Sequence, residues 1–264
     1  MRKDDSPRLK KITLLRERVA NWEEYPFNIP VIHSFKELEL RSRIVFFVGE
    51  NGSGKSTLLE AIAYHCGFGR EGGSKHIRVE TAPEHNEPVS RLSRAMRLAW
   101  SNKILTGFFF RAESFFNTAT YVESLMADDP TALDPYGGKS LHVRSHGEAL
   151  LALFENRFFK RGFYLMDEPE AALSPQRQLS FLLILHNLLK AGPEVQVIVA
   201  THSPIILSYP DAQIISFDGK KLEEIKYEQT TPYQVVSGFL KNPQLYLKKL
   251  LDQQPNLFSS RPKR

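Results

Sequence analysis

The sequence predicts an α/β fold in which a mixed central sheet is flanked by helices. An uninterrupted apolar run, Ile44–Val48, leads into a glycine-rich segment and then into a helical pattern over 57–66. Two further short apolar runs, 163–166 and 197–200, each end in a cluster of polar residues. Continuous apolar runs of this length are typical of strands that are buried on both faces of a parallel sheet.

The composition is that of an ordinary globular protein. The chain has 264 residues, of which 42% are hydrophobic and 25% charged, with a single cysteine, Cys66. These values exclude collagen-like, disordered and disulfide-scaffold classes, and no apolar run approaches the ~20 residues of a membrane helix. With no secretory signal either, we expect a soluble, cytoplasmic protein without membrane insertion. The net charge of +5 is concentrated at the two ends of the chain, so it does not indicate a generally basic surface.

The remaining elements follow from apolar periodicity and from turn residues. We expect strands over 9–17 and 107–111 and helices over 91–100 and 148–160. A helix opens with Ser174 as N-cap and Pro175 in its first turn, and it ends at Gly192. A hairpin over 214–227 and helices broken at Asn242-Pro243 complete the chain. We therefore predict a single domain over 1–264, with an inserted helical arm at about 68–145 and a C-terminal hairpin and helices at 204–264.

The glycine-rich segment fits the phosphate-binding pattern G-x-x-x-x-G-K-[ST]. Its glycines allow backbone N–H groups to converge on phosphate oxygens, and the helix that follows contributes the partial positive charge of its N-terminus. Lys55 is expected to reach the β- and γ-phosphates, and the Ser56 hydroxyl to bind Mg²⁺. The predicted ATP-binding residues are Gly49, Glu50, Asn51, Gly52, Ser53, Gly54, Lys55, Ser56 and Thr57.

Two later strand ends supply the residues expected to carry out hydrolysis. Asp167 follows one strand and is a candidate Mg²⁺ ligand, and Glu168 beside it is placed to polarise an attacking water. The segment DEPEAALS and the following Thr201-His202-Ser203 resemble the ABC ATPase superfamily, whose corresponding pattern is DEPTSALD. The resemblance implies ATP hydrolysis, with His202 as the switch histidine that contacts the γ-phosphate.

A third motif matches the superfamily less closely. Ser145 and Gly147 lie where that superfamily carries its LSGGQ signature, although His146 replaces the first glycine. The resemblance implies that Ser145 and Gly147 contact the γ-phosphate held by a second subunit. The same residues also fit a capping box in which Ser145 and Glu148 cap a helix. A zinc site at His142 and His146 has suitable spacing, but the sequence offers no further ligand nearby.

Two other positions stay open at this stage. The glutamine of the superfamily's Q-loop is missing. Either Glu113 replaces it as a contact to Mg²⁺ or water, or one of Arg111 and Glu113 only caps the next helix. Trp22, Tyr25 and Phe27 are candidates for stacking on adenine by position only, and each could equally belong to the core.

The overall pattern most resembles stand-alone bacterial AAA-family ATPases of the RecF/OLD-like, non-transporter branch. This resemblance implies an ATP-dependent head-to-tail homodimer that drives a soluble partner, such as a separately encoded effector or nuclease, or a nucleic-acid process of the DNA-repair or phage-defence kind. The alternatives are a nucleotide-gated binding module with slow hydrolysis and, less favoured, a transporter subunit. The region between Glu113 and Ser145 is short for the helical arm of a transporter subunit.

A row of arginines gives the nucleic-acid hypothesis one concrete form. Arg91, Arg94 and Arg97 would share one face of the helix expected over 91–100. This face is either ordinary solvated surface or a contact for the phosphates of DNA or RNA.

Overall fold

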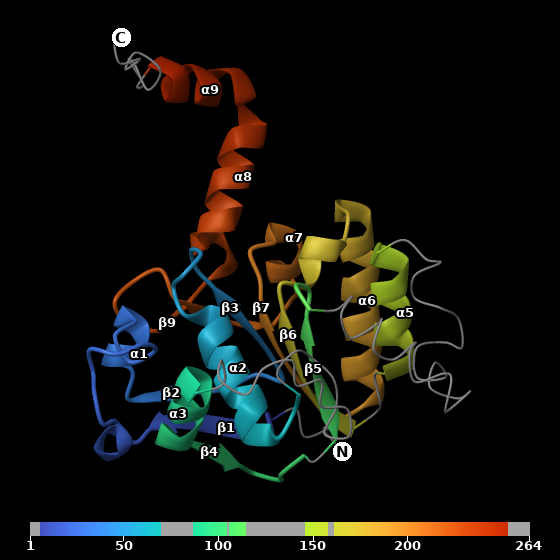
Figure 1. Cartoon of the computed structure of the whole chain (residues 1–264). Helices are drawn as coiled ribbons and strands as arrows, with labels where there is room; N and C mark the ends of the chain where they lie inside the picture. Colours follow the sequence, from blue (N-terminus) through green and yellow to red (C-terminus); the bar gives the residue numbers. More distant parts are fainter. Residues whose placement is uncertain (1–5, 70–86, 105, 115–145, 158–160, 253–264) are drawn as a thin grey trace, which may run out of the picture.

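The centre of the fold is a six-stranded sheet with the order β5-β6-β7-β3-β8-β9 (Figure 1). The structure, a computed structural model, describes residues 6–69, 87–104, 106–114, 146–157 and 161–252. The first five strands are parallel, and β9 pairs antiparallel with β8. The strands are β3 (Ile44–Val48), β5 (Gly107–Arg111), β6 (Arg161–Asp167), β7 (Glu194–Ala200), β8 (Gln213–Ser216) and β9 (Glu223–Ile225). The expected mixed α/β fold is confirmed.

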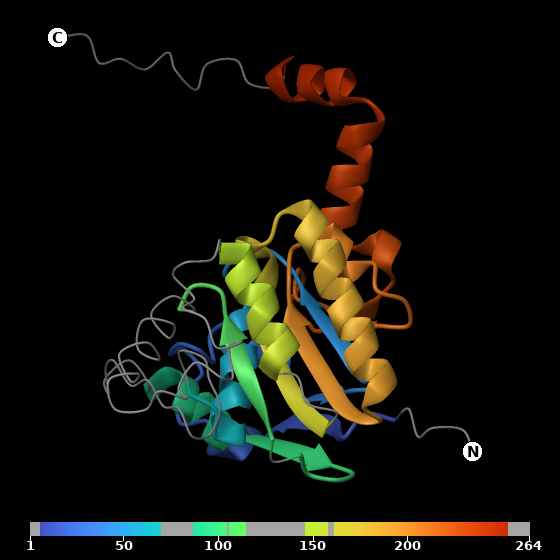
Figure 2. The same cartoon turned by 90° about the vertical axis from the view of Figure 1, so that its right-hand side faces the viewer.

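Both faces of this sheet are covered, which explains the uninterrupted apolar strands. Phe46 and Phe47 point to opposite faces and both are fully buried. One face packs against α2 (Lys55–Cys66) and a smaller sheet, and the other packs against α5 (His146–Arg157), α6 (Pro175–Ala191) and α7 (Pro204–Leu207). Figure 2 shows α5 and α6 lying side by side across the second face.

The smaller sheet is antiparallel, with the order β2-β1-β4. It contains β1 (Leu9–Leu14), β2 (Glu37–Glu39) and β4 (Met96–Trp100), and α1 (Pro30–Ser34) and α3 (Glu87–Ala95) lie beside it. Its strands are amphipathic, with Ile12 fully buried and Lys11 partly exposed. The described residues of the region expected to be an inserted arm thus include β4 and β5, which belong to the two sheets.

The single helix expected over 91–100 is wrong. Helix α3 ends at Ala95, and Met96–Trp100 continues as β4 in antiparallel register with β1. Arg97 is exposed on the strand, while Arg91 binds Glu24 at 2.6 Å and the Arg94 guanidinium donates to the Ser90 carbonyl and hydroxyl. The three arginines therefore do not form one helical stripe, and this argument for nucleic-acid binding is lost.

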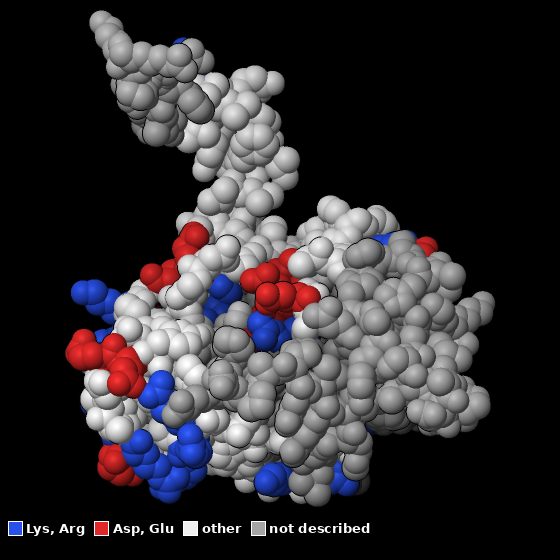
Figure 3. All heavy atoms as spheres, in the orientation of Figure 1, with Lys and Arg blue, Asp and Glu red and all other residues white. Residues whose placement is uncertain are grey.

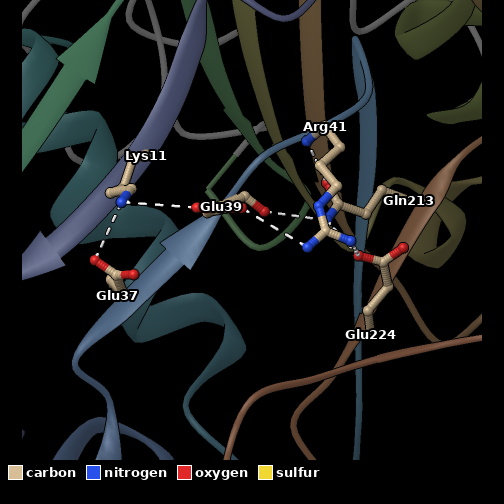
Figure 4. Close-up of polar contacts among 6 residues, drawn as sticks. All are labelled: Lys11, Glu37, Glu39, Arg41, Gln213 and Glu224. Carbon is tan, nitrogen blue, oxygen red and sulfur yellow. Dashed lines mark hydrogen bonds and ion pairs between the residues drawn. The ribbon is translucent and has the colours of Figure 1, made fainter.

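Two buried glutamines tie the smaller sheet to the central one. Gln196 of β7 is fully buried, and its amide accepts from the Leu9 N–H at 2.7 Å and donates to the Leu9 carbonyl at 3.1 Å. On β8, the Gln213 amide donates to the Glu39 carbonyl, at the end of β2 in the smaller sheet, and to the Glu224 carboxylate. Figure 4 shows how Arg41 extends this network from Glu39 to Glu224. Because a buried amide needs its hydrogen bonds, these contacts fix the position of one sheet on the other.

The strand expected over 9–17 ends earlier, at Leu14, because the chain turns into a 3₁₀ helix at Arg16–Arg18. The helix expected over 148–160 is α5, and residues 158–160 lie outside the described residues.

The other expected elements agree with the structure. Ser174 caps α6 by accepting from the Arg177 N–H, and Gly67 ends α2 in a left-handed conformation at φ 80°. The hairpin is β8–β9, and the last helices are α8 (Thr231–Lys241) and α9 (Pro243–Asp252), which meet at Asn242. Short 3₁₀ turns occupy Arg16–Arg18, Pro169–Ala172 and Tyr227–Gln229. None of the described helices is both long and apolar enough to cross a membrane.

Candidate functional site

The site lies at the carboxyl edge of the central sheet, where a single row of paired residues crosses five strands. Arg111 pairs with Asp167, and Asp167 pairs with Ala200. The row continues from Ala200 to Phe47 and on to Ile215. The segments that leave the sheet just after this row carry the phosphate loop, Glu168 and His202. Figure 3 shows acidic side chains gathered beside basic ones on the face below α8.

The phosphate loop is held open by glycines in conformations that other residues rarely adopt. Gly52 and Gly54 have φ of 78° and 101°, and a Cβ at Gly54 would lie 3.0 Å from Ile29 Cγ2. Gly54 is also the N-cap of α2, so the loop ends at the free N–H groups of that helix. The Asp218 carboxylate anchors the start of the loop by accepting from the Glu50 N–H at 2.7 Å.

Lys55 places a buried ammonium under this loop. Its residue is 4% exposed, and Nζ donates to the Gly49 carbonyl at 2.7 Å and to the Glu50 carbonyl at 3.0 Å. Burial lowers the pKa of Lys55, while the charges of Glu168 and Asp167 act in the opposite direction. Two carbonyl oxygens only partly compensate a buried cation, so the site is electrostatically suited to receive an anion.

Asp167 and Ser56 lie in direct contact on the other side of the loop. The Ser56 hydroxyl donates to Asp167 Oδ1 at 2.9 Å, and Arg111 Nε lies 3.8 Å from Asp167 Oδ2. Burial raises the pKa of Asp167 to about 6, although the hydrogen bond from Ser56 and the charge of Arg111 lower it. A hydroxyl and a carboxylate at this position are the protein ligands that Mg²⁺ takes beside phosphates, so the predicted roles of both residues fit.

Arg111 is the residue of the site that the sequence reasoning failed to assign. Its guanidinium contacts Glu60 at 3.3 Å and Glu113 at 3.1 Å, in addition to Asp167. Glu113 itself has an 85% exposed side chain. The row across the sheet therefore sets the Arg111 cation, and not the Glu113 carboxylate, directly beside Asp167. The feature of the sequence that indicates this role is the position of Arg111 as the last residue of a buried strand.

A cavity of about 730 Å³ opens between these groups. Ser56, Asp167 and Glu113, the three predicted metal contacts, all line it. Its size suits a small-molecule ligand. Its other lining residues include Arg111, Ala112, Glu168 and the segment 171–174.

Glu168 and His202 face each other across the end of β6 and β7. His202 Nε2 lies 3.6 Å from Glu168 Oε1, and the His202 N–H donates to Glu170 Oε1 at 2.5 Å. Glu168 adopts φ 50°, an uncommon conformation for a residue other than glycine, and its side chain is 43% exposed. Burial and the Lys55 charge lower the pKa of His202, so its imidazole is neutral at pH 7.

Two buried atoms near the loop carry no hydrogen bond. Ser53 Oγ and His202 Nε2 are both shielded from solvent and have no hydrogen-bond partner within the described residues. Such orphaned polar atoms are uncommon in proteins. Together with the Lys55 ammonium, they fit a bound polyphosphate, which offers many acceptor oxygens. In the described parts of the chain, no group of three or more His, Cys, Asp or Glu side chains forms a self-sufficient metal site.

The signature segment is only partly described. Ser145 and His142 lie outside the described residues, as does the side chain of His146 at the start of α5. Gly147 is buried against α6, where an added Cβ would lie 2.5 Å from the Arg177 guanidinium. Glu148 accepts from that same guanidinium at 3.0 Å. The absence of a side chain at Gly147 thus leaves the space that the Arg177 side chain occupies within the subunit.

The three aromatic candidates for adenine stacking differ in exposure. Phe27 is 4% exposed and belongs to the core, and Trp22 packs on Phe27 and beneath Arg16. Tyr25 is 49% exposed, and its hydroxyl lies 3.0 Å from Thr57 Oγ1, next to the phosphate loop.

Known protein families match both halves of the site. A family described as "AAA domain" matches residues 28–102, which contain the phosphate loop. A second, described as "AAA domain, putative AbiEii toxin, Type IV TA system", matches residues 148–208, which contain Asp167, Glu168 and His202. Both matches are to AAA domains, and they confirm the resemblance of the chain to ABC/AAA-type P-loop ATPases. Its assignment to the RecF/OLD-like branch stays a prediction.

Solved structures of similar chains are distant. An SMC head domain from Thermotoga maritima has 17% identity and a TM-score of 0.44, over 83% of this chain and 98% of that one. The protein cbiO1 from Clostridium perfringens, part of the ABC transporter complex cbiONQ, has 16% identity and a TM-score of 0.45, over 81% and 91% of the two chains. No curated protein sequence gives a significant match.

The raised pKa of Asp167 predicts a pH-dependent stability in the absence of Mg²⁺. Between the unfolded pKa near 4 and the folded value of about 6, the folded state binds more protons, so stability falls as the pH rises. Asp167→Asn removes this penalty, and we expect the free energy of unfolding at pH 7.5 to rise by about 2 kcal/mol. At pH 4 the gain should vanish. Urea unfolding with EDTA at both pH values measures the difference.

The exposed carboxylate Glu155 provides the matched control for this measurement. Glu155→Gln should change the stability little at either pH, because its side chain lies in water. A loss of stability in Asp167→Asn that is equal at both pH values would contradict the assigned charge state.

Proposed function

We propose that the chain binds ATP with Mg²⁺ at this edge of the sheet and hydrolyses it to ADP and phosphate. The observation that carries the proposal is the convergence of three groups at the carboxyl edge of the central sheet. These are the Lys55 ammonium, the Ser56–Asp167 pair and the Glu168–His202 pair. Phosphoryl transfer to water requires a cation for the phosphates, ligands for Mg²⁺ and a base for the attacking water, and the three groups supply these in that order.

The phosphate groups would be bound by the loop and by Lys55. Loop N–H groups, the N-terminus of α2 and the Ser53 hydroxyl offer donors to the β- and γ-phosphates. Lys55 would exchange its two carbonyl acceptors for phosphate oxygens. The exposed ring of Tyr25 supports a role beside the adenine base, since it is the most exposed of the three candidates.

Mg²⁺ would be held by Ser56 directly and by Asp167 directly or through water. When bound, the ion neutralises charge that develops on the transferred phosphoryl group. Arg111 restrains the Asp167 carboxylate from the opposite side. Glu113, exposed at the rim of the cavity, could contact the ion or its water, as proposed from the sequence.

Glu168 would act as the general base and His202 as the sensor of the γ-phosphate. The 43% exposed Glu168 carboxylate is accessible to a water molecule and stands next to the proposed metal position. It would accept a proton from the attacking water. The unpartnered Nε2 of the neutral His202 would supply a hydrogen bond to the γ-phosphate.

Replacing Glu168 tests its role as the general base. Glu168→Gln should retain ATP binding within about threefold and lose turnover by about 10²-fold or more, because the amide cannot accept the proton. Lys55→Ala should lose binding as well as turnover. Equilibrium binding of a fluorescent ATP analogue and steady-state phosphate release separate the two effects. Wild-type turnover in Glu168→Gln would show that another group is the base.

We also propose that two subunits form a head-to-tail homodimer in which each signature segment completes the partner's ATP site. Support comes from Gly147, the second residue of α5, which lies on a different element from the phosphate loop of its own chain. Ser145 at this N-terminus would offer its hydroxyl to a γ-phosphate on the second subunit. The dimer would close on ATP and open after hydrolysis.

Subunit mixing tests this arrangement. Lys55→Ala and Ser145→Arg should each be inactive alone, whereas a mixed dimer has one intact site built from both chains. Co-expression should restore up to about a quarter of wild-type turnover, since half of random pairs are mixed. The control mixes Lys55→Ala with Glu168→Gln, where both defects fall in the same half of the site, and should restore nothing. Phosphate release no greater than the sum of the separate variants would refute the shared site.

We propose that the cycle of ATP binding and hydrolysis drives a change in a soluble partner, such as a separately encoded effector or nuclease, or in nucleic acid. The type IV toxin–antitoxin description of the second matched family supports a defence-like process over transport. A nucleotide-gated binding module with slow hydrolysis uses the same residues. It would differ in a low turnover that a partner does not stimulate.

A further inference from the structure

Glu170 carries a buried carboxylate beside the site that the proposed function leaves without a role. The residue lies in the 3₁₀ turn Pro169–Ala172, which follows β6 at the carboxyl edge of the sheet. Its Oε1 accepts from the His202 N–H at 2.5 Å, in the segment that follows the neighbouring strand β7 (Figure 1). Its Oε2 is shielded from solvent and has no hydrogen-bond partner within the described residues. The side chain therefore joins the segment that follows Glu168 to the segment that carries His202.

A carboxyl group in this position costs free energy that a smaller polar side chain would not. Burial raises the pKa of Glu170, while the hydrogen bond from the His202 N–H lowers it. The contact does not depend on titration, because a carboxyl protonated on Oε2 still accepts through Oε1. The superfamily pattern DEPTSALD has threonine at this position, so the resemblance of the sequence does not predict the contact.

The main chain on either side of His202 is held by other groups. The N–H of the fully buried Thr201 donates to the Phe47 carbonyl of β3 at 3.1 Å. The N–H of Ser203 donates to Thr201 Oγ1 at 3.0 Å, and the Ser203 hydroxyl caps α7. Between these two residues, the N–H of His202 is held by Glu170. Glu170 thus fixes the backbone of the residue whose imidazole Nε2 has no hydrogen bond.

Glu168, in contrast, is held by the main chain. Its N–H donates to the Ala200 carbonyl at 2.9 Å, and its carbonyl accepts from the Ala171 N–H at 3.1 Å. A substitution at position 170 leaves both of these donors and acceptors in place. It removes only the contact to His202, and so acts on one side of the 3.6 Å pair between Glu168 Oε1 and His202 Nε2.

We propose that Glu170 is a positioning residue whose side chain holds the His202 main chain, so that the imidazole faces the γ-phosphate of bound ATP. Truncation of Glu170 leaves a half-buried N–H without its acceptor and frees the His202 backbone to move. The γ-phosphate then loses its contact with His202, whereas the contacts of Lys55 and the phosphate loop remain. This inference rests on the proposed function, in which His202 senses the γ-phosphate.

The test compares the affinities of the full chain for AMP-PNP and ADP in the presence of Mg²⁺, because only AMP-PNP carries a γ-phosphate. Competition against a fluorescent ADP analogue gives the two dissociation constants and their ratio. Glu170→Ala should lower the preference for AMP-PNP about tenfold, as should His202→Ala, because each removes the same hydrogen bond to a charged oxygen. The affinity for ADP should change less than about threefold in both variants.

A double-mutant cycle shows whether Glu170 acts through His202. Adding Glu170→Ala to His202→Ala should lower the preference by no more than about a further twofold, whereas independent effects would multiply to about a hundredfold. Glu170→Gln should keep the preference within about threefold of wild type, because its amide oxygen still accepts from the His202 N–H.

Gln178→Ala is the matched control for the loss of a buried polar side chain. Gln178 accepts from the Ser203 hydroxyl at 2.5 Å and donates to the Leu173 carbonyl at 3.0 Å. Its removal leaves buried groups unsatisfied next to His202 but does not touch the His202 N–H. The variant should unfold at a lower temperature and keep the preference for AMP-PNP. Far-UV circular dichroism establishes that each variant is folded.

Three results would overturn the proposal. They are a double variant whose losses multiply, a Glu170→Gln variant as impaired as Glu170→Ala, and an equal loss of preference in Gln178→Ala. Failure of the proposed function gives a different result, since His202→Ala would then keep the wild-type preference. That result would overturn the role of His202 and, with it, the role of Glu170.

Discussion

The in-register alignment of parallel strands at the carboxyl edge of the central sheet is the constraint on which the site depends. It sets Arg111, Asp167, Ala200 and Phe47 in one row, although 153 positions of sequence separate the first and last of them along the chain. A shift of one strand by a single residue would turn Asp167 to the other face of the sheet. The buried glutamines that lock the two sheets together therefore support the chemistry indirectly.

Burial of charge is the second consequence of this alignment. Lys55, Asp167 and Arg111 come together where little water reaches, and each is compensated by a neighbour of opposite charge or by a polar group. The compensation is incomplete, as the lowered pKa of Lys55 and the raised pKa of Asp167 indicate. A polyphosphate with Mg²⁺ would complete it, because the anion pairs with the ammonium and the cation with the carboxylate. This arrangement of charges therefore favours binding of the nucleotide together with its metal ion.

The sequence predicts the strands and the phosphate loop well because their signals are local. Uninterrupted apolar runs indicate buried strands, and glycines spaced before a lysine indicate a phosphate loop, without reference to distant residues. The helix expected over 91–100 fails because its apolar residues fit both a helix and, from Met96 onward, a strand whose partner β1 is distant in sequence. The sequence does not assign Arg111 for a related reason, since only the pairing of β5 with β6 brings it to Asp167. The sequence also predicts the C-terminal helices α8 and α9, but only the three-dimensional structure shows that they project away from the body.

A crystal structure with Mg²⁺ and a non-hydrolysable ATP analogue tests the central claim most directly. The account predicts that Lys55 Nζ leaves the Gly49 and Glu50 carbonyls for β- and γ-phosphate oxygens. Ser56 Oγ should then coordinate Mg²⁺, with Asp167 bound to the ion or to its water, and His202 Nε2 should face the γ-phosphate. A nucleotide bound elsewhere, or phosphates in the loop with Lys55 still held by its two carbonyls, would contradict it.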